Sequence, residues 1–216
     1  MPRNAIVFVD LDQTAQSMPG GMLTDAIKLD WQPPIGAKRR LHRETTRMIT
    51  PAYVRLMAHY NAEMNRRLYA AAARLTEAER KADRGAFWQS IHGTLTHILW
   101  GDTQWMSRFD AWPKPDAGQK QSAAMLDDFA VLQTRRTKAD ADITAWANRV
   151  DDAWLAEDLV WFSGSAGKEM RRQKGPLVAH FFNHQTHHRG QAHALLTACG
   201  QDTGDTDLFL VVPEAA

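Results

Sequence analysis

Histidines near the C-terminal end of the chain form the pattern best suited to chemistry. Five of the nine histidines fall within residues 180–193. An α-helix advances about 100° per residue, which places His180, His184, His187 and His188 within an arc of about 100° on one face. An imidazole buried without a partner is costly. These side chains are therefore expected to be hydrogen-bonded or to bind a metal ion.

Two histidines about one turn apart on a helix can bind the same ion, as in helical zinc sites. This run offers three such pairs, namely His180 with His184, His184 with His187, and His184 with His188. Spacing alone leaves these three alternatives open.

A further ligand must come from another helix, because most metal sites need three or more donors. His97 is the best candidate, since Gly93 and Gly101 beside it leave room for close approach of a second helix. His59 is a weaker candidate among ordinary core residues. We expect His92 to lie about 140° from His97, on an outer face.

Two familiar metal motifs are excluded by the residues present. Zinc proteases with His-Glu-x-x-His place a glutamate base directly after the first histidine, whereas this chain has Gln185 after His184. Carboxylate-bridged di-iron bundles need Glu-x-x-His, which does not occur in the sequence. A mononuclear, all-histidine site with open positions remains. Such an ion can lower the pKa of bound water toward ~7, or can hold a thiolate.

The elements that must position these residues are helices. Thr50 followed by Pro51 predicts a helix start, and Gly200 predicts a helix end. Residues 159–170, with Gly164 and Gly167, predict a short hairpin. The expected fold class is all-α, a four-helix bundle with a hairpin between the third and fourth helices. The predicted helices cover about 51–75, 87–110, 121–148 and 174–199.

The second predicted helix has apolar residues on two sides. A stripe of four apolar residues lies opposite the His97 face, namely Trp88, Leu95, Leu99 and Met106. A second apolar face indicates either a homodimer contact or one broad face within a single core. The pattern favours neither alternative.

Residues 1–47 differ from the rest of the chain. They contain Gly20-Gly21, Pro33-Pro34 and a basic cluster at 38–40, without sustained helical periodicity. We expect this extension to be poorly structured, and we hypothesise that the working chain begins at Met48. The predicted domains are thus an extension, 1–47, and a metal-binding bundle, 48–216.

Composition excludes several classes of partner. The net charge of +1 gives no electrostatic footprint for nucleic acid. No apolar run approaches the roughly 20 residues that span a bilayer. The single cysteine, Cys199, permits no internal disulfide and predicts a reducing, cytoplasmic location.

Several segments together resemble the DinB (damage-inducible) family. They are Gly93–His97 with Trp105, the run His180–Gln191 with its Arg-Gly-Gln ending, the first-helix run 60–68, and the run 84–92. The resemblance extends over about 48–212. It implies a four-helix bundle, commonly dimeric, with a divalent ion bound by three histidines. Matched to the motif, those ligands are His97, His184 and His188.

The same resemblance implies a small-molecule substrate. Some relatives are transferases or isomerases that depend on low-molecular-weight thiols, and others are regarded as hydrolases. Zinc and nickel are the expected ions, since imidazole suits both. The alternative is a non-catalytic metal-binding stress-response protein. A closed site with a fourth protein ligand, such as His180 or His59, would favour that alternative.

Other residues near the predicted site could serve either the site or the structure. Gln191 is a candidate to orient a ligand, as ligand-orienting partners are common around metal sites. His180 is a candidate to line the pocket, and the alternative is a structural histidine. Asn61 is also a candidate to line the pocket, and the alternative is a hydrogen bond between helices. The tryptophans Trp100, Trp105 and Trp161 are expected in the core. Gly190 is expected to permit close helix packing.

Overall fold

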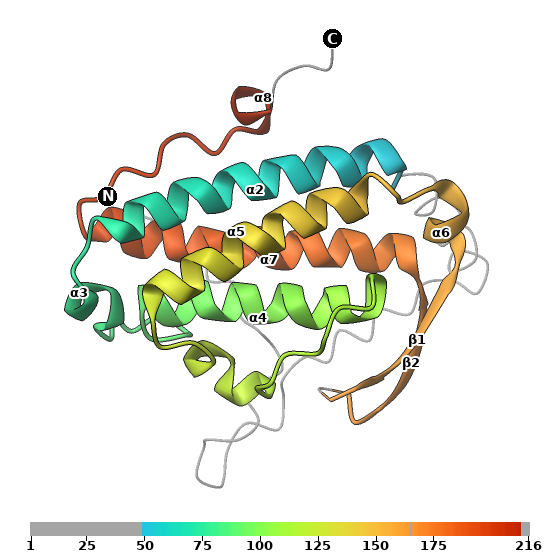
Figure 1. Cartoon of the computed structure of the whole chain (residues 1–216), viewed down its shortest axis with the longest axis horizontal. Coiled ribbons are helices and arrows are strands. Elements are labelled where there is room, and N and C mark those ends of the chain that lie inside the picture. The colour runs from blue at the N-terminus through green and yellow to red at the C-terminus, as the bar shows by residue number, and fades with distance from the viewer. Residues whose placement is uncertain (1–48, 165, 213–216) are drawn as a thin grey trace, which may run out of the picture.

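The computed structural model describes residues 49–164 and 166–212. Most of this part is helical, with an antiparallel pair of strands (Figure 1). The predicted extension, 1–47, lies outside the described residues. Within the described chain, no helix is long and apolar enough to cross a membrane.

Four long helices lie side by side (Figure 1). Helix α2 packs against α5 and α7, and α4 packs against α7 and α5. The mostly helical fold predicted from periodicity is therefore confirmed. The bounds are Pro51–Ala73 for α2, Ile91–Phe109 for α4, Phe129–Ala147 for α5 and Lys174–Ala198 for α7.

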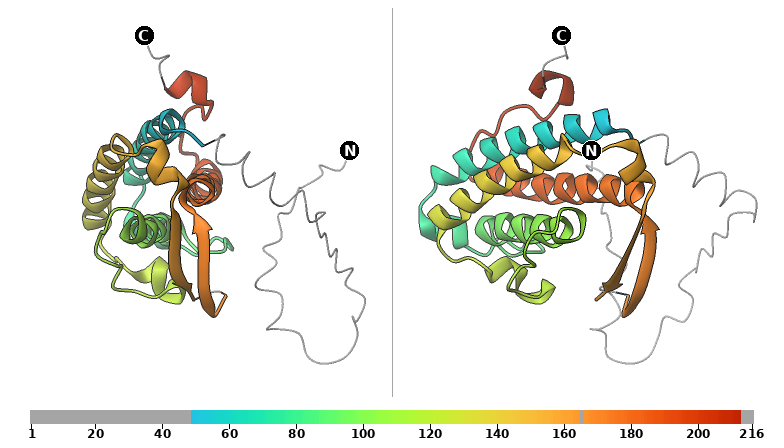
Figure 2. Two further views of the ribbon diagram at one scale, coloured as in Figure 1. Left: turned by 90° about the vertical axis from the view of Figure 1, so that its right-hand side faces the viewer. Right: turned by 45° about the vertical axis from the view of Figure 1, so that its right-hand side comes forward.

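Shorter elements join the long helices. The predicted hairpin is present: β1 (Asp158–Ser163) pairs with β2 (Lys168–Gln173), with Trp161 opposite Met170. Figure 2 shows this hairpin projecting away from the start of α7. The remaining short elements are α3 (Glu77–Lys81), the 3₁₀ helix η1 (Gln119–Ala124), α6 (Asp152–Ala156) and α8 (Leu208–Val211).

Both predicted helix ends have the expected capping geometry. Thr50 Oγ1 accepts a hydrogen bond from the backbone N–H of Tyr53 at 3.2 Å, and Pro51 occupies the first helical position. Gly200 follows α7 with φ +72°, a conformation that costs glycine little.

Two predicted helix starts were wrong by several residues. Helix α4 begins at Ile91 rather than 87, because Gln89 has φ 62° and Ser90 Oγ caps the helix at Gly93 N–H. Helix α5 begins at Phe129 rather than 121, because Asp128 Oδ1 accepts from Val131 N–H. Residues 119–124, which were expected to open α5, form the separate η1.

The second apolar stripe of α4 is buried within the chain itself. Leu95 and Met106 are fully buried, and Leu99 is 3% exposed. Trp88 precedes the helix and stacks on His97. The stripe therefore contributes to one broad internal face, and it does not provide a homodimer contact.

The core consists of two apolar clusters with a layer of polar side chains between them. One cluster includes Phe109, Trp146 and Phe181, and the other includes Leu68 and Leu95. Along each long helix, the polar side chains fall between the two clusters. This polar layer comprises Asn61 and Asn65 from α2, Asp102 from α4, Arg136 and Asp140 from α5, and Gln185 and Arg189 from α7.

The polar layer is joined across the helices by charged hydrogen bonds. Arg136 donates to Asp102 at 2.5 Å and pairs with Asp140 at 2.8 Å, while Gln185 donates to the other Asp102 oxygen at 2.9 Å. Asn65 donates to Asp140 at 2.9 Å. Burial raises the pKa of Asp140 to about 6 despite its contact with Arg136, which shows how strongly this layer is desolvated.

Removing one charge from this layer should strongly destabilise the fold. Arg136→Met leaves Asp102 and Asp140 buried without their shared cation, and we expect a loss of about 3–5 kcal/mol in the free energy of unfolding. Urea unfolding at neutral pH measures it. The neighbouring, exposed Arg135→Met should change stability by no more than about 0.5 kcal/mol. Equal effects of the two substitutions would show that the layer contributes no special stability.

Candidate metal centre

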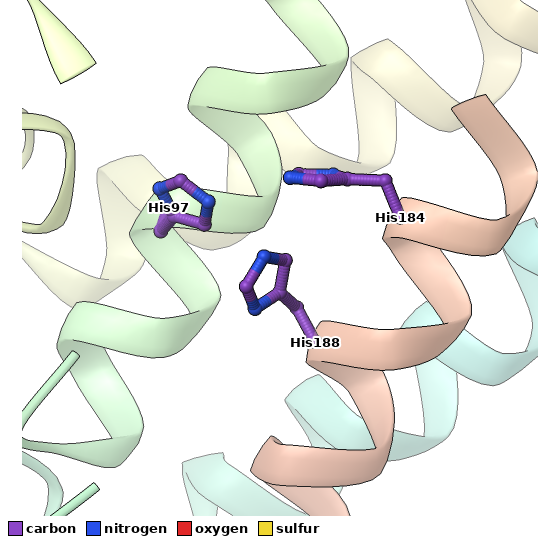
Figure 3. A group of neighbouring side chains, drawn as sticks. All are labelled: His97, His184 and His188. Atoms are coloured by element: carbon purple, nitrogen blue, oxygen red, sulfur yellow. The ribbon is translucent and has the colours of Figure 1, made fainter. Parts of the chain in front are cut away.

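Three imidazoles meet between α4 and α7. His97 comes from the middle of α4, and His184 and His188 lie one turn apart on α7 (Figure 3). One ring nitrogen from each lies within 4.8 Å of the others. Two nitrogens on one tetrahedral ion, each at ~2.0–2.1 Å, are about 3.4 Å apart, so small shifts of these side chains would bring the three nitrogens onto one ion.

Gly101 sets the close approach of α7 to α4. A Cβ atom at this position would lie 2.7 Å from His184 Cε1, closer than any ordinary contact. The ring of His184 therefore occupies the space that any larger residue would fill. In the described chain this ring makes no hydrogen bond, so contact with Gly101 and the neighbouring imidazoles sets its orientation.

His97 is fixed by two contacts from outside α4. Its Nδ1 lies 2.8 Å from Ser122 Oγ, a fully buried hydroxyl of η1. The ring of Trp88 stacks on the imidazole with centroids 3.9 Å apart and planes 22° apart. These contacts leave the Nε2 edge of His97 directed toward the α7 histidines (Figure 3).

His188 is oriented by a residue of its own helix. Its Nδ1 lies 2.8 Å from Gln191 Oε1, and because an amide oxygen only accepts, Nδ1 carries the proton. The amide nitrogen of Gln191 lies 3.3 Å from His187 Nε2. Sequence reasoning placed Gln191 beside His188 correctly. His187 is exposed and contacts Gln191, rather than a neighbouring helix.

Burial favours the neutral form of His97 and His184. Desolvation, followed by repulsion from the other imidazoles, lowers the pKa of His97 from 6.5 to about 2 and that of His184 to about 3. His97 is 2% exposed and His188 7% exposed, whereas His184 is only partly buried. Neutral imidazoles with free lone pairs are the form that binds a metal ion.

The other predicted site residues lie at different distances from this group. His180 is next to it: its ring centroid is 6.1 Å from that of His184, and the side chain is exposed. Asn61 is in the polar layer, where it donates to Asp140 at 3.3 Å and accepts from Arg189. The hydrogen-bonding alternative therefore describes Asn61 better than a pocket role.

Two structural predictions near the site were wrong. His92 does not face outward; it is buried, and its Nε2 lies 2.7 Å from the carbonyl oxygen of Leu126. Gly190 does not mediate helix packing, because a Cβ there would meet nothing within 4 Å. Both predictions relied on the position of the residue along its helix, which does not specify which other elements pack against it.

Sequence reasoning missed Ser122 and the role of Trp88. Ser122 lies 25 positions after His97 in a segment that was expected to be α-helical. Its position follows from the packing of η1 against α4, which no local pattern encodes. Trp88 was noted as apolar, but its place outside α4 depends on the Gln89–Ser90 turn.

A separate cavity of about 530 Å³ lies away from the three histidines. It is lined by the opposite side of α4, residues 111–116 and α5, including Leu99, Trp112 and Arg135. None of the three histidines lines it. The chemistry of the donor set, rather than the presence of a cavity, therefore locates the candidate site.

A helical protein in which three neutral imidazoles from two helices converge has the donor set of a transition-metal-binding protein. The sequence model of the DinB family matches residues 48–213, most of the chain. The chain belongs to the DinB family, as its motifs indicated. No curated protein matches the chain.

The buried imidazoles make a prediction for the metal-free protein. Because the pKa values of His97 and His184 are lowered in the folded state, the unfolded chain takes up protons first. The stability that these groups contribute is complete above about pH 6.5 and decreases as the pH falls toward their folded pKa values. The slope is at most about 1.4 kcal/mol per pH unit for each group.

Urea unfolding in chelator between pH 7.5 and pH 5 measures this slope. His97→Phe keeps an aromatic ring against Trp88 but removes one titrating imidazole. The dependence of the free energy of unfolding on pH should therefore decrease by the contribution of that one group. An unchanged slope in this variant would contradict the assignment.

Proposed function

We propose that this protein binds a divalent metal ion through Nε2 of His97, His184 and His188. The proposal is supported by the convergence of these rings and by the partners of their Nδ1 atoms. Ser122 and Gln191 engage Nδ1 of His97 and His188, and the proposal assigns Nε2 of each ring to the ion. Zinc or nickel suits this nitrogen donor set. The surrounding domain, 48–216, is proposed to be a four-helix bundle.

We further propose that the ion serves an enzyme, a metal-dependent hydrolase or a thiol-dependent transferase acting on a small molecule. A divalent ion held by neutral imidazoles supplies a nucleophile at neutral pH by lowering the pKa of a water or thiol ligand. The protein's own residues hold the imidazoles neutral and exclude water from the His97 side. His184 and His180 leave the opposite side open to solvent.

The ligand count favours an enzyme over the alternative, a non-catalytic metal-binding stress-response protein. Among the described residues, no fourth histidine, cysteine or carboxylate joins the three-histidine group. Neither His180 nor His59 completes a closed tetrahedron. A site with three protein ligands keeps a position for substrate, as catalytic zinc sites do.

The remaining parts of the proposal rest on the sequence and the family. The lone Cys199 fits a reducing, cytoplasmic location, and a net charge of +1 argues against a nucleic-acid partner. A low-molecular-weight thiol is the proposed co-substrate for the transferase alternative. A homodimer is expected from the family, with an interface other than the buried stripe of α4.

Alanine substitutions test the ligand set. His97→Ala, His184→Ala and His188→Ala should each remove most of the bound zinc or nickel, because two imidazoles hold an ion far less firmly than three. His92→Ala is the matched control, since His92 bonds to Leu126 instead. Metal content after gel filtration is the measurement, and full occupancy in the His184→Ala protein would refute the assignment. Assays of the loaded wild type with and without small thiols then distinguish hydrolase from transferase.

Two glycines of the site helices give a second test. Gly101→Ala forces a methyl group into the space of the His184 ring, and we expect metal affinity to fall by about 10- to 100-fold. Gly190→Ala meets open space, so it should leave affinity unchanged and stabilise α7 by about 0.5–1 kcal/mol. Competition with a chelating dye measures affinity. Equal affinities in the two variants would contradict the contact between Gly101 and His184.

A further inference from the structure

Solvent reaches the three-histidine group on the side of His180 and His184. His97 and His188 are buried, His184 is partly buried, and His180, one turn before His184, is exposed. Trp88 covers His97 from the other direction. The side marked by His180 therefore offers a small molecule a route to the group.

Two tryptophans and an arginine lie along that side. Trp105, one turn after Gly101 on α4, meets the ring of His180 edge-on at 5.2 Å. Trp161 of the hairpin meets Trp105 at 5.9 Å. The guanidinium carbon of Arg108 lies 4.6 Å from the centroid of Trp105 and 5.8 Å from that of Trp161. Arg108 is thus held over aromatic faces, near the open side of the site.

Arg108 has no anionic partner in the part of the chain that the structure describes. It is half-buried, and burial lowers its pKa with no compensating carboxylate. The carboxylate of Asp110, two residues later, is already engaged by Arg149 through both oxygens at 2.7 and 2.8 Å. The buried Arg136 differs, since it pairs with two aspartates of the polar layer, and the buried Arg189 donates to Asn61 and Thr186 instead.

The geometry of stacking leaves Arg108 able to bind a ligand. A guanidinium carries five N–H donors in its plane, and stacking on an indole uses only its face. The in-plane donors match the two oxygens of a carboxylate. Desolvation strengthens such a contact relative to one on an exposed arginine.

We propose that Arg108, held against Trp105 and Trp161, binds a carboxylate of the small-molecule substrate whose reacting end lies at the three-histidine group. The substrate class is thus an organic acid with an apolar body that packs against the outer side of Trp105 and His180. The position of the reacting end rests on the proposed metal-dependent function, whereas the contact of the carboxylate with Arg108 does not.

Two probes of the same shape test the carboxylate contact in the metal-free, full-length protein. Equilibrium dialysis at pH 7 compares 2-naphthoate with the neutral 2-naphthamide. We expect the wild type to prefer the acid by about ten-fold, the size of one charge-assisted hydrogen-bonded contact. Arg108→Gln should abolish the preference. Arg108→Lys keeps the positive charge but loses the paired N–H donors of the guanidinium, so it should retain part of the preference.

The control is Arg135→Gln, which removes an exposed arginine of the separate cavity. The preference should survive this substitution. A preference that persists in Arg108→Gln overturns the proposal. So does a preference that is lost in Arg135→Gln, because that result would place the acid in the other cavity.

A second experiment links Arg108 to the metal site through a spectroscopic readout. The Co²⁺-loaded protein is titrated with ω-mercapto acids of increasing chain length and with the corresponding ω-mercapto alcohols. Each thiol releases its proton to the buffer when sulfur coordinates, which gives a sulfur-to-cobalt absorption band. The acids should bind more tightly than the alcohols only in chains long enough to reach Arg108, and Arg108→Gln should remove this advantage.

The outcomes separate the two proposals. If no thiol gives the band, the thiol-dependent function fails, while the dialysis result with 2-naphthoate decides the Arg108 contact by itself. If acids and alcohols bind equally at every length, Arg108 does not serve the metal site, and the proposed substrate class is wrong.

Discussion

The buried ion pairs of Arg136 with Asp102 and Asp140 constrain the whole molecule. Charges taken out of water are stable only when partners and hydrogen bonds are correctly placed. Here those partners come from all four long helices, so a shift of any one helix by a turn would remove an ion pair or a hydrogen bond from a buried charge. The apolar clusters on either side tolerate small shifts far better, because dispersion contacts are not directional. The polar layer therefore fixes the helix register.

The same helix register positions the residues of the candidate metal site. Asp102 directly follows Gly101, and Gln185 directly follows His184. The hydrogen bond from Gln185 to Asp102 thus joins α4 to α7 one residue beyond the contact of His184 with Gly101. Two aspartates and two arginines balance within the layer, so it adds little net charge. An ion held by three neutral imidazoles would keep its full charge and attract an anionic ligand, as would Arg108 nearby.

The sequence predicted what depends on local periodicity and on residue chemistry. Helical spacing placed His184 and His188 on one face, and the cap at Thr50 and the stop at Gly200 were correct. The sequence-based predictions failed where a tertiary contact overrides the local pattern. Ser122 lies in a segment with helical periodicity but forms part of η1, where its hydroxyl reaches His97. His92 shares a helix with His97, yet helical phase alone could not show that η1 and Leu126 cover its outer side.

The residues that orient the three histidines differ from the residues that line the open side of the candidate site. Holding an ion and selecting a substrate would therefore depend on different side chains. Ser122, Trp88 and Gln191 hold the imidazoles of His97 and His188, so the proposed binding of an ion would depend on contacts away from the His180 side. Trp161 belongs to the hairpin, outside the long helices that carry the three histidines. Changes in the hairpin can therefore alter which molecule fits beside Arg108 without disturbing the ligands. Under the proposed function, such a separation would let the substrate change while the three histidines stay in place, because different residues serve the two purposes.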